Sequence, residues 1–266
     1  MYQSHWGLQQ SPFRNCLDPQ LLFQSPSHEE ALARLQFLVD EHRRLGLLMG
    51  PAGSGKSLLL EVLTAQLRRR GKPVAKVGLV GVESEEVLAL CATQFGLNPD
   101  ASEPIAALWR TLTDRIAEYR YQKLETVILL DDADKASAHV LPQIVRLAKH
   151  DPSPDSRLTL VLAGRRERMG RLGEPLLGLA DLRIDVQPWD LDDTADFLQA
   201  SLLRAGRQSP VFADPALERM HHLAHGIPRQ VRQLADFALL AGAGRALDQI
   251  DADTVESAYE ELGVGS

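Results

Sequence analysis

The stretch of sequence that decides the fold reads Gly50-Pro51-Ala52-Gly53-Ser54-Gly55-Lys56-Ser57. It matches the phosphate-binding loop pattern G-x-x-x-x-G-K-[ST] at every fixed position. The apolar run at 45–49 that precedes it predicts a short buried strand, and the pattern at 58–70 predicts a helix. This strand–loop–helix context is the one that the motif requires, so the stretch predicts a nucleotide-binding site rather than a chance match.

The residue types of the loop suit the phosphates of a nucleotide. Its glycines let the backbone curl so that the N–H groups point inward at an anion, and the following helix adds its positive N-terminal end. We expect Lys56 to reach the β- and γ-phosphates and Ser57 to hold Mg²⁺ through its hydroxyl group. The predicted nucleotide contacts comprise residues 50–57 and Leu58, and the predicted cofactors are ATP and Mg²⁺.

Composition and charge limit the classes of function. A chain of 266 residues is long enough for one large domain or for a core with a second, smaller domain. Its 44% hydrophobic and 24% charged residues are typical of a soluble globular protein. The net charge of −7 gives no overall attraction to nucleic acid or to an anionic membrane, although it is compatible with a local basic patch.

Three features of the sequence bear on where in the cell the protein resides. No run of about 18 apolar residues occurs, so no membrane span is expected. The N-terminus shows no signal-peptide pattern, because His5 and Trp6 interrupt it and no apolar segment follows. Cys16 and Cys91 lack the spacing of metal ligands, and two cysteines argue against a disulfide framework. We therefore expect a protein of the reducing cytoplasm.

Strand and helix patterns alternate through the first two thirds of the chain. Strand patterns occur at 45–49, 74–80, 126–130, 158–162 and 182–186. Helical patterns occur between them at 58–70, 84–95, 102–120 and 140–149. The run at 126–130 is apolar throughout, as expected of a central parallel strand that is buried on both faces. The alternation predicts an α/β core with a parallel sheet flanked by helices.

The chain begins with a mixed, turn-rich segment at residues 1–26. Its scattered apolar anchors are Trp6, Leu8, Phe13, Leu21, Leu22 and Phe23. They predict an ordered leader that packs on the core. Ser27 and Glu30 have the spacing of a capping box, which predicts that a helix opens there.

The character of the sequence changes after Pro188. Only helical patterns follow, at about 192–205, 214–224, 228–241 and 252–262. We expect a nucleotide-binding domain at 1–188, which includes the leader, and a small all-helical lid domain at 189–266.

Two acidic residues follow the apolar run at 126–130. An acidic residue at the exposed end of a buried strand can reach Mg²⁺ or its water shell, and we expect this role for Asp131. The next residue, Asp132, is placed to orient or deprotonate the attacking water. The alternative is that the carboxylates merely end the strand and cap the next helix. That is our interpretation of Asp134, and it stays open for Asp132.

Three arginines occur where a nucleotide site can use a cation. Arg165 follows the strand at 158–162, Arg183 stands just before a short strand, and Arg229 starts a helix of the lid. The buried stripe of the lid helix leaves Arg229 free to point into the cleft between the domains, and the preceding Pro228 suits a first helical turn. Taken alone, each arginine is more often a solvated surface charge.

The order of these elements resembles the AAA+ ATPases, and within them the general secretion pathway protein A (ExeA-like) group. The leader matches the opening of that group at Trp6-Gly7-Leu8, Ser11-Pro12-Phe13, Asp18-Pro19, Phe23 and Ser25-Pro26-Ser27-His28-Glu29-Glu30-Ala31-Leu32. The lid matches it at Gly226-Ile227-Pro228-Arg229. The resemblance covers essentially the whole chain. These leader and lid motifs are much more specific than the phosphate loop, which many NTPases share.

The resemblance implies a role for each candidate residue. It makes residues 50–57 the Walker A motif and Asp131 and Asp132 the Walker B residues. It makes Arg165 sensor 1 and Arg229 sensor 2. Arg183 corresponds to the arginine finger, which acts on a neighbouring subunit. Two residues depart from the group. Asp132 stands where Glu is usual, and Arg165 stands where Asn or Gln is usual. These departures leave the rate of hydrolysis open.

We interpret the chain as a cytoplasmic AAA+ ATPase with a P-loop NTPase fold. It is expected to bind ATP and Mg²⁺ between core and lid, to form an ATP-dependent homo-oligomer, and to drive or regulate the assembly of a larger machine with an unknown protein partner. The resemblance makes that machine secretion- or envelope-related and allows association with the inner face of the membrane through partners. Three alternatives stay open: a DNA-associated regulator resembling transposition target-selection ATPases, a small-molecule phosphotransferase, and a nucleotide-gated scaffold with little turnover.

Overall fold

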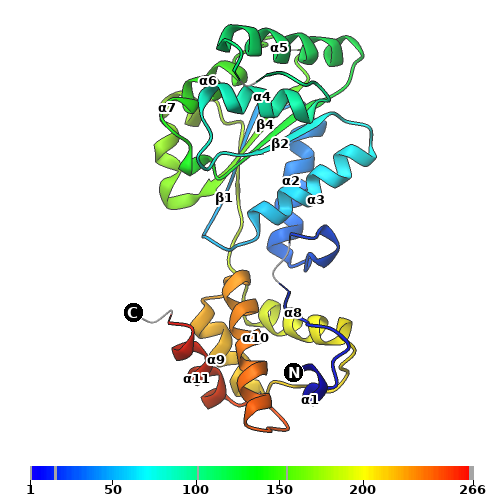
Figure 1. Cartoon of the computed structure of the whole chain (residues 1–266), viewed down its shortest axis with the longest axis vertical. Helices are drawn as coiled ribbons and strands as arrows, with labels where there is room; N and C mark the ends of the chain where they lie inside the picture. The colour runs from blue at the N-terminus through cyan, green and yellow to red at the C-terminus, as the bar shows by residue number, and fades with distance from the viewer. Residues whose placement is uncertain (1, 15–16, 101, 154, 264–266) are drawn as a thin grey trace.

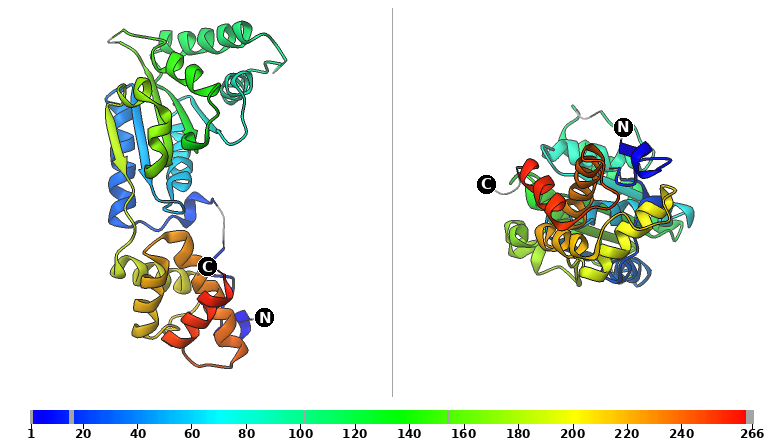
Figure 2. Two further views of the ribbon diagram at one scale, coloured as in Figure 1. Left: turned by 90° about the vertical axis from the view of Figure 1, so that its left-hand side faces the viewer. Right: turned by 90° about the horizontal axis from the view of Figure 1, so that it is seen from below.

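A computed structural model describes residues 2–14, 17–100, 102–153 and 155–263. The molecule is elongated and consists of two parts that follow each other along its long axis (Figures 1 and 2). The larger part contains a sheet with helices on both sides, and the smaller part contains helices.

The sheet has five strands in the order β2-β3-β4-β1-β5, and all neighbouring strands are parallel. The strands are β1 (Leu45–Gly50), β2 (Val74–Gly78), β3 (Thr126–Asp131), β4 (Leu158–Arg165) and β5 (Leu182–Asp185). Every residue of β3 is buried, as is all of β4 except its last residue. The predicted α/β fold with a parallel sheet is confirmed, because continuous apolar runs are stable only where both faces of a strand are covered.

Helices cover the two faces of the sheet and make three layers (Figure 1). One face packs on α2 (Pro26–Asp40) and α3 (Lys56–Arg69). The other face packs on α4 (Ser84–Gln94), α5 (Ile105–Tyr121), α6 (Val140–Ala148) and the short α7 (Glu174–Leu177). Neighbouring residues of β3 alternate between the two cores, with Leu129 on the first side and Leu130 on the second. This is the two-residue period of a strand.

The start of α2 differs from the predicted one. The helix begins at Pro26 with Ser25 as its N-cap, and the Ser25 hydroxyl accepts the backbone N–H of His28. Ser27 is therefore not the cap; its hydroxyl instead accepts the backbone N–H of Gln187 at 2.9 Å, just beyond β5. Proline is favoured in the first helical turn because it has no N–H to leave unpaired, and this shifts the start by two residues.

The second part of the molecule consists of α8 (Leu191–Arg204), α9 (Asp214–Ala224), α10 (Pro228–Gly244) and α11 (Ala252–Glu261). These helices enclose a separate apolar core that includes Phe197, Met220 and Leu239. As predicted, every helix or strand that follows Pro188 in the described residues is a helix, and one isolated β-bridge joins Phe212 and Ile250.

The leader packs on the α/β core only in part: Pro19–Leu21 contacts α3 and Leu22 packs on the core there, but the start of the leader lies elsewhere. Its first helix, α1 (Tyr2–Trp6), lies beside α10 in the C-terminal part rather than on the sheet (Figure 1). The indole N–H of Trp6 donates to the Leu239 carbonyl at 2.8 Å, and the hydroxyl of Tyr2 donates to Asp236 at 2.6 Å. Trp6 is buried in the apolar core that α10 helps to form, whereas Leu22 packs on the core beside α2 and α3. The domain limits 1–188 and 189–266 stay a proposal, with the start of the leader attached to the lid.

The structure describes two of the features that bear on where in the cell the protein resides, namely membrane-spanning helices and cysteines. Among the described residues, no helix is both long enough and apolar enough to cross a bilayer. Cys91 is a free thiol buried in α4, where burial raises its pKa to about 12, whereas Cys16 lies outside the described residues.

Candidate nucleotide-binding site

The carboxyl ends of three neighbouring strands meet at one edge of the sheet. β4 lies between β1 and β3, and its last residue, Arg165, pairs with Gly50, where β1 passes into the phosphate loop. β3 ends on the other side of β4 at Asp131. The phosphate loop, Arg165 and the acidic turn therefore lie along this edge, which is where open α/β sheets bind ligands.

The loop between β1 and α3 has the backbone conformation that its glycines allow. Gly53 and Gly55 have φ angles of +84° and +96°, a left-handed region that residues with a side chain rarely adopt. Helix α3 begins directly afterwards at Lys56. The local sequence thus produces a tight curl that ends on a helix N-terminus, which is an arrangement that favours an anion.

Lys56 is folded back over the loop. Its side-chain amine donates to the carbonyl oxygens of Gly50 at 3.0 Å and of Pro51 at 2.8 Å. Only 9% of the residue is exposed, and this burial lowers the pKa of Lys56, while the nearby Asp131 opposes the shift. A buried amine whose partners are uncharged carbonyls is well suited to a negatively charged ligand.

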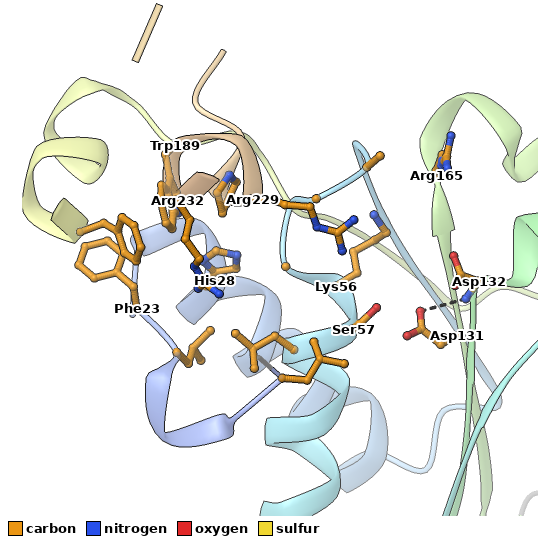
Figure 3. A pocket seen from close by; sticks show the side chains of 18 of the residues that line it. Phe23, His28, Lys56, Ser57, Asp131, Asp132, Arg165, Trp189, Arg229 and Arg232 are labelled. Atoms are coloured by element: carbon orange, nitrogen blue, oxygen red, sulfur yellow. Dashed lines mark hydrogen bonds between the residues drawn. The ribbon is translucent and has the colours of Figure 1, made fainter. Parts of the chain in front are cut away.

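Ser57 and Asp131 point toward one another from opposite sides of the cavity (Figure 3). Asp131 is 8% exposed, and one oxygen of its carboxylate accepts the backbone N–H of Asp132 at 2.9 Å. A hydroxyl group and a carboxylate are oxygen ligands of the kind that Mg²⁺ takes in nucleotide sites. The residues present therefore fit the predicted metal.

Asp132 lies in the same turn in a left-handed conformation, with φ of 54°. Aspartate tolerates this region better than most residues. Its carboxylate forms an ion pair with Lys135 at 2.9 Å, and both side chains are partly exposed. Asp134 is instead buried, and its carboxylate accepts the backbone N–H of Arg165 at 3.2 Å. This contact ties the turn to β4, in agreement with the structural interpretation of Asp134.

The lid contacts the phosphate loop through the first turn of α10. The backbone N–H of Arg229 donates to the Gly53 carbonyl at 3.2 Å. A Cβ atom at Gly53 would lie only 2.9 Å from the Cβ atom of Arg229, so the close approach depends on glycine. The guanidinium group of Arg229 extends toward Lys56 (Figure 3).

A cavity of about 300 Å³ lies between these elements. The predicted site residues that line it are Ala52, Gly53, Gly55, Lys56, Ser57, Leu58, Asp131, Asp132, Arg165 and Arg229. Its other end has apolar walls, with Leu22 and Phe23 from the leader and Trp189 from the connection to the lid, and His28 and Arg232 lie beside them (Figure 3). Gly50, Pro51 and Ser54 belong to the loop but are outside this lining. The cavity thus joins a polar, cationic end to an end with apolar walls, as a nucleotide requires.

Comparison with known families agrees with this geometry. The model of a family described as "AAA domain" matches residues 39–172, from the end of α2 to the segment after β4. The chain belongs to the AAA domain family. It is 29% identical over 269 residues to General secretion pathway protein A of Aeromonas hydrophila, which covers 99% of this chain and 49% of that protein. The resemblance to the general secretion pathway protein A group is confirmed, and this AAA chain spans about half the length of that relative.

Solved structures show the same fold. Cdc6p from Pyrobaculum aerophilum is 17% identical with a TM-score of 0.73, over 92% of this chain and 70% of that chain. The Aeropyrum pernix ORC1 protein in complex with DNA is 19% identical with a TM-score of 0.66, over 91% and 67%. The RuvB Holliday junction branch migration motor of Thermotoga maritima is 17% identical with a TM-score of 0.60, over 96% and 74%. They confirm a fold with an α/β core and C-terminal helices.

Arg183 of the AAA chain does not join the other predicted site residues. It is the second residue of β5 rather than the residue before that strand, and its backbone pairs with Leu47 in the middle of β1. Its side chain is exposed and lies outside the lining of the cavity. Arg183 therefore lies on an edge strand of the sheet, outside the lining of the cavity of its own chain.

Several residues that line the AAA site escaped the sequence analysis, among them Lys135, Trp189, Arg232 and His28. Arg232 lines the cavity and lies 5.8 Å from the ring of Phe197 on α8. Its signal is the spacing of three residues from Arg229, which puts both arginines on one face of α10. His28 lies against the loop, and its Nε2 atom is 2.8 Å from the Ser54 carbonyl oxygen. A single histidine early in a helix gives no signal that it will meet a loop so far along the chain.

Proposed function

We propose that this AAA chain is an ATPase that binds ATP and Mg²⁺ in the cavity between the sheet edge and α10. The observation that carries the proposal is the lining of that cavity, which combines the phosphate loop, the acidic turn after β3 and Arg229 of the lid. The apolar side chains of Leu22 and Phe23 at the leader end of the cavity support binding of the adenine base of ATP there. Membership of the AAA family supports nucleotide binding as such.

The residues divide the work according to their chemistry. Lys56 would exchange its two carbonyl partners for the β- and γ-phosphates. Ser57 and Asp131 would hold Mg²⁺, which when bound neutralises charge on the phosphates. Asp132 would orient or deprotonate the attacking water, and Arg229 would contact the γ-phosphate from the lid. Arg165 lines the same cavity and would add a second cation at the end of β4.

A second candidate is a nucleotide-gated scaffold that binds ATP and rarely hydrolyses it. The observation that favours it is the ion pair between Asp132 and Lys135 at 2.9 Å. A carboxylate that is paired with a lysine must leave its partner before it can meet a water molecule. Asp132 is also one methylene shorter than glutamate. Both features favour slow turnover over fast turnover.

We further propose that hydrolysis requires a second copy of the chain. Arg183 is exposed on edge strand β5 and lies outside the lining of its own cavity, which supports a role in the site of a neighbouring subunit. An arginine that enters from a neighbour can stabilise charge on the transferring phosphoryl group. The proposed assembly is therefore an ATP-dependent homo-oligomer.

The process served is proposed from the relative alone. The similarity to General secretion pathway protein A supports the assembly of a secretion- or envelope-related machine through a protein partner. The ORC1 neighbour is described in complex with DNA, which keeps a DNA-associated role as an alternative. The net charge of −7 does not support that alternative. DNA affinity that falls steeply with salt would favour it.

Hydrolysis and binding are tested together with one pair of variants. Asp132→Ala is expected to bind ATP with about the wild-type affinity and to release no phosphate, because it removes only the group that activates water. Asp114→Ala is the matched control, since Asp114 is exposed on α5, away from the cavity. Phosphate release by Asp132→Ala at the rate of Asp114→Ala would show that Asp132 only ends the strand.

A further inference from the structure

His28 is a buried histidine that lies against the phosphate loop and lines the cavity. It stands in the first turn of α2, is 3% exposed and contacts the ring of Trp189 edge to face at 6.0 Å between centroids. None of the roles discussed so far uses it. Its position is nevertheless defined by polar contacts at both ring nitrogens, which packing alone does not require.

The two hydrogen bonds of the ring determine its tautomer. Nε2 lies 2.8 Å from the Ser54 carbonyl oxygen, and Nδ1 lies 2.9 Å from the Ser25 hydroxyl. A carbonyl oxygen only accepts, so Nε2 must carry the proton and donate it. In the neutral ring Nδ1 then accepts from the Ser25 hydroxyl. Burial lowers the pKa of His28, which favours this neutral form.

The bond to Ser54 sets the direction of a peptide group in the loop. In a trans peptide the carbonyl group and the following N–H point to opposite sides. Because the Ser54 carbonyl points at His28, the N–H of Gly55 points away from the ring. The ring also lies close to the loop, since a Cβ atom at Gly55 would be only 2.7 Å from Nε2. His28 therefore occupies one side of this peptide and leaves its N–H for the other.

We propose that His28 is a positioning residue of the nucleotide site, which holds the Ser54–Gly55 peptide in the orientation that presents the Gly55 N–H to a phosphate. The inference rests on the proposed ATP site and adds a residue outside the motif to it. The Ser54 residue is fully buried, so without the histidine its carbonyl would lack a partner and the peptide would rotate to find one. The loop would then adopt several conformations, and only one of them would present the Gly55 N–H to an anion.

Two substitutions separate this role from simple packing. His28→Gln keeps an N–H donor at about the reach of Nε2, whereas His28→Phe keeps the ring and removes the donor. Isothermal titration with ATP and Mg²⁺ is expected to give about tenfold weaker binding for His28→Phe and a value within about threefold of the wild type for His28→Gln. Leu112→Ala, in the core between α5 and the sheet, is the control: it should lower the melting temperature without weakening ATP binding.

A second measurement does not depend on nucleotide. Amide hydrogen exchange in residues 50–58 of the nucleotide-free protein should be faster in His28→Phe than in His28→Gln or the wild type. If the wild type binds no ATP but the exchange differs in this way, the proposed function fails while the positioning of the loop stands. Equal exchange and equal affinity in all three proteins would overturn the inference. So would a His28→Gln variant that binds ATP as weakly as His28→Phe, since supplying the N–H donor would then restore nothing.

Discussion

Releasing Asp132 from Lys135 should speed hydrolysis. The proposed role of Asp132 requires its carboxylate to leave an ion pair of 2.9 Å in which the two side chains are 33% and 40% exposed. Ion pairs exposed to this degree contribute about 0.2–1 kcal/mol. If that energy is part of the barrier, its removal corresponds to a factor of about 1.4 to 5 in rate. Lys135→Gln removes the charge and keeps most of the length of the side chain.

The assay is phosphate release at saturating ATP and fixed protein concentration. Lys76→Gln is the matched control, because Lys76 pairs with Glu61 at 2.6 Å and lies outside the lining of the cavity. Salt provides a second test, since it screens partly exposed pairs: the wild-type rate should rise with ionic strength more than the Lys135→Gln rate does. A Lys135→Gln rate below that of the wild type would refute the reasoning and make Lys135 a contact of the nucleotide.

Three further predictions follow from other parts of the molecule. Trp6→Ala should destabilise the protein by about 3–5 kcal/mol in thermal or denaturant unfolding, because it removes a ring that is 1% exposed; a loss below about 1 kcal/mol would mean that the leader is not anchored on the lid. Arg183→Ala and Lys56→Ala should each hydrolyse ATP slowly, and a mixture should recover activity; no recovery, with wild-type activity independent of concentration, would exclude a role between subunits. Because the pKa of His28 is lowered from its ordinary value of 6.5, the unfolded chain takes up this proton first, so stability should fall as the pH drops below about 6.5 and level off below the folded pKa. The unfolding free energy of His28→Gln should lack this component, and identical pH profiles would contradict the assignment of a buried neutral ring.

The parts of the fold that local sequence determines could be predicted. The phosphate loop is one continuous motif, and the strand at 126–130 is a continuous apolar run, so both carry their signal within a few residues. The acidic turn was placed correctly for the same reason, since it follows that strand directly. Arg229 could be assigned to the cleft because the buried stripe of its own helix leaves it on the other face.

The parts that depend on distant contacts could not be predicted. Trp6 donates to the Leu239 carbonyl, and no pattern near residue 6 indicates whether an apolar anchor will meet the sheet or the lid. His28 meets Ser54 only because α2 packs beside the loop. The exposure of Arg183 depends on which strand lies at the edge of the sheet. The sequence of a strand does not by itself determine the place of that strand in the sheet.

The central claim is that the cavity at the sheet edge binds ATP through the phosphate loop. Isothermal titration of ATP and Mg²⁺ into the wild type, Lys56→Ala and Lys76→Ala tests it most directly. Charge-assisted hydrogen bonds contribute about 1.5–3 kcal/mol, so Lys56→Ala should bind about 10- to 100-fold more weakly, while Lys76→Ala should bind like the wild type. Equal affinity of Lys56→Ala and the wild type would contradict the account, since the loop would then contribute no phosphate contact.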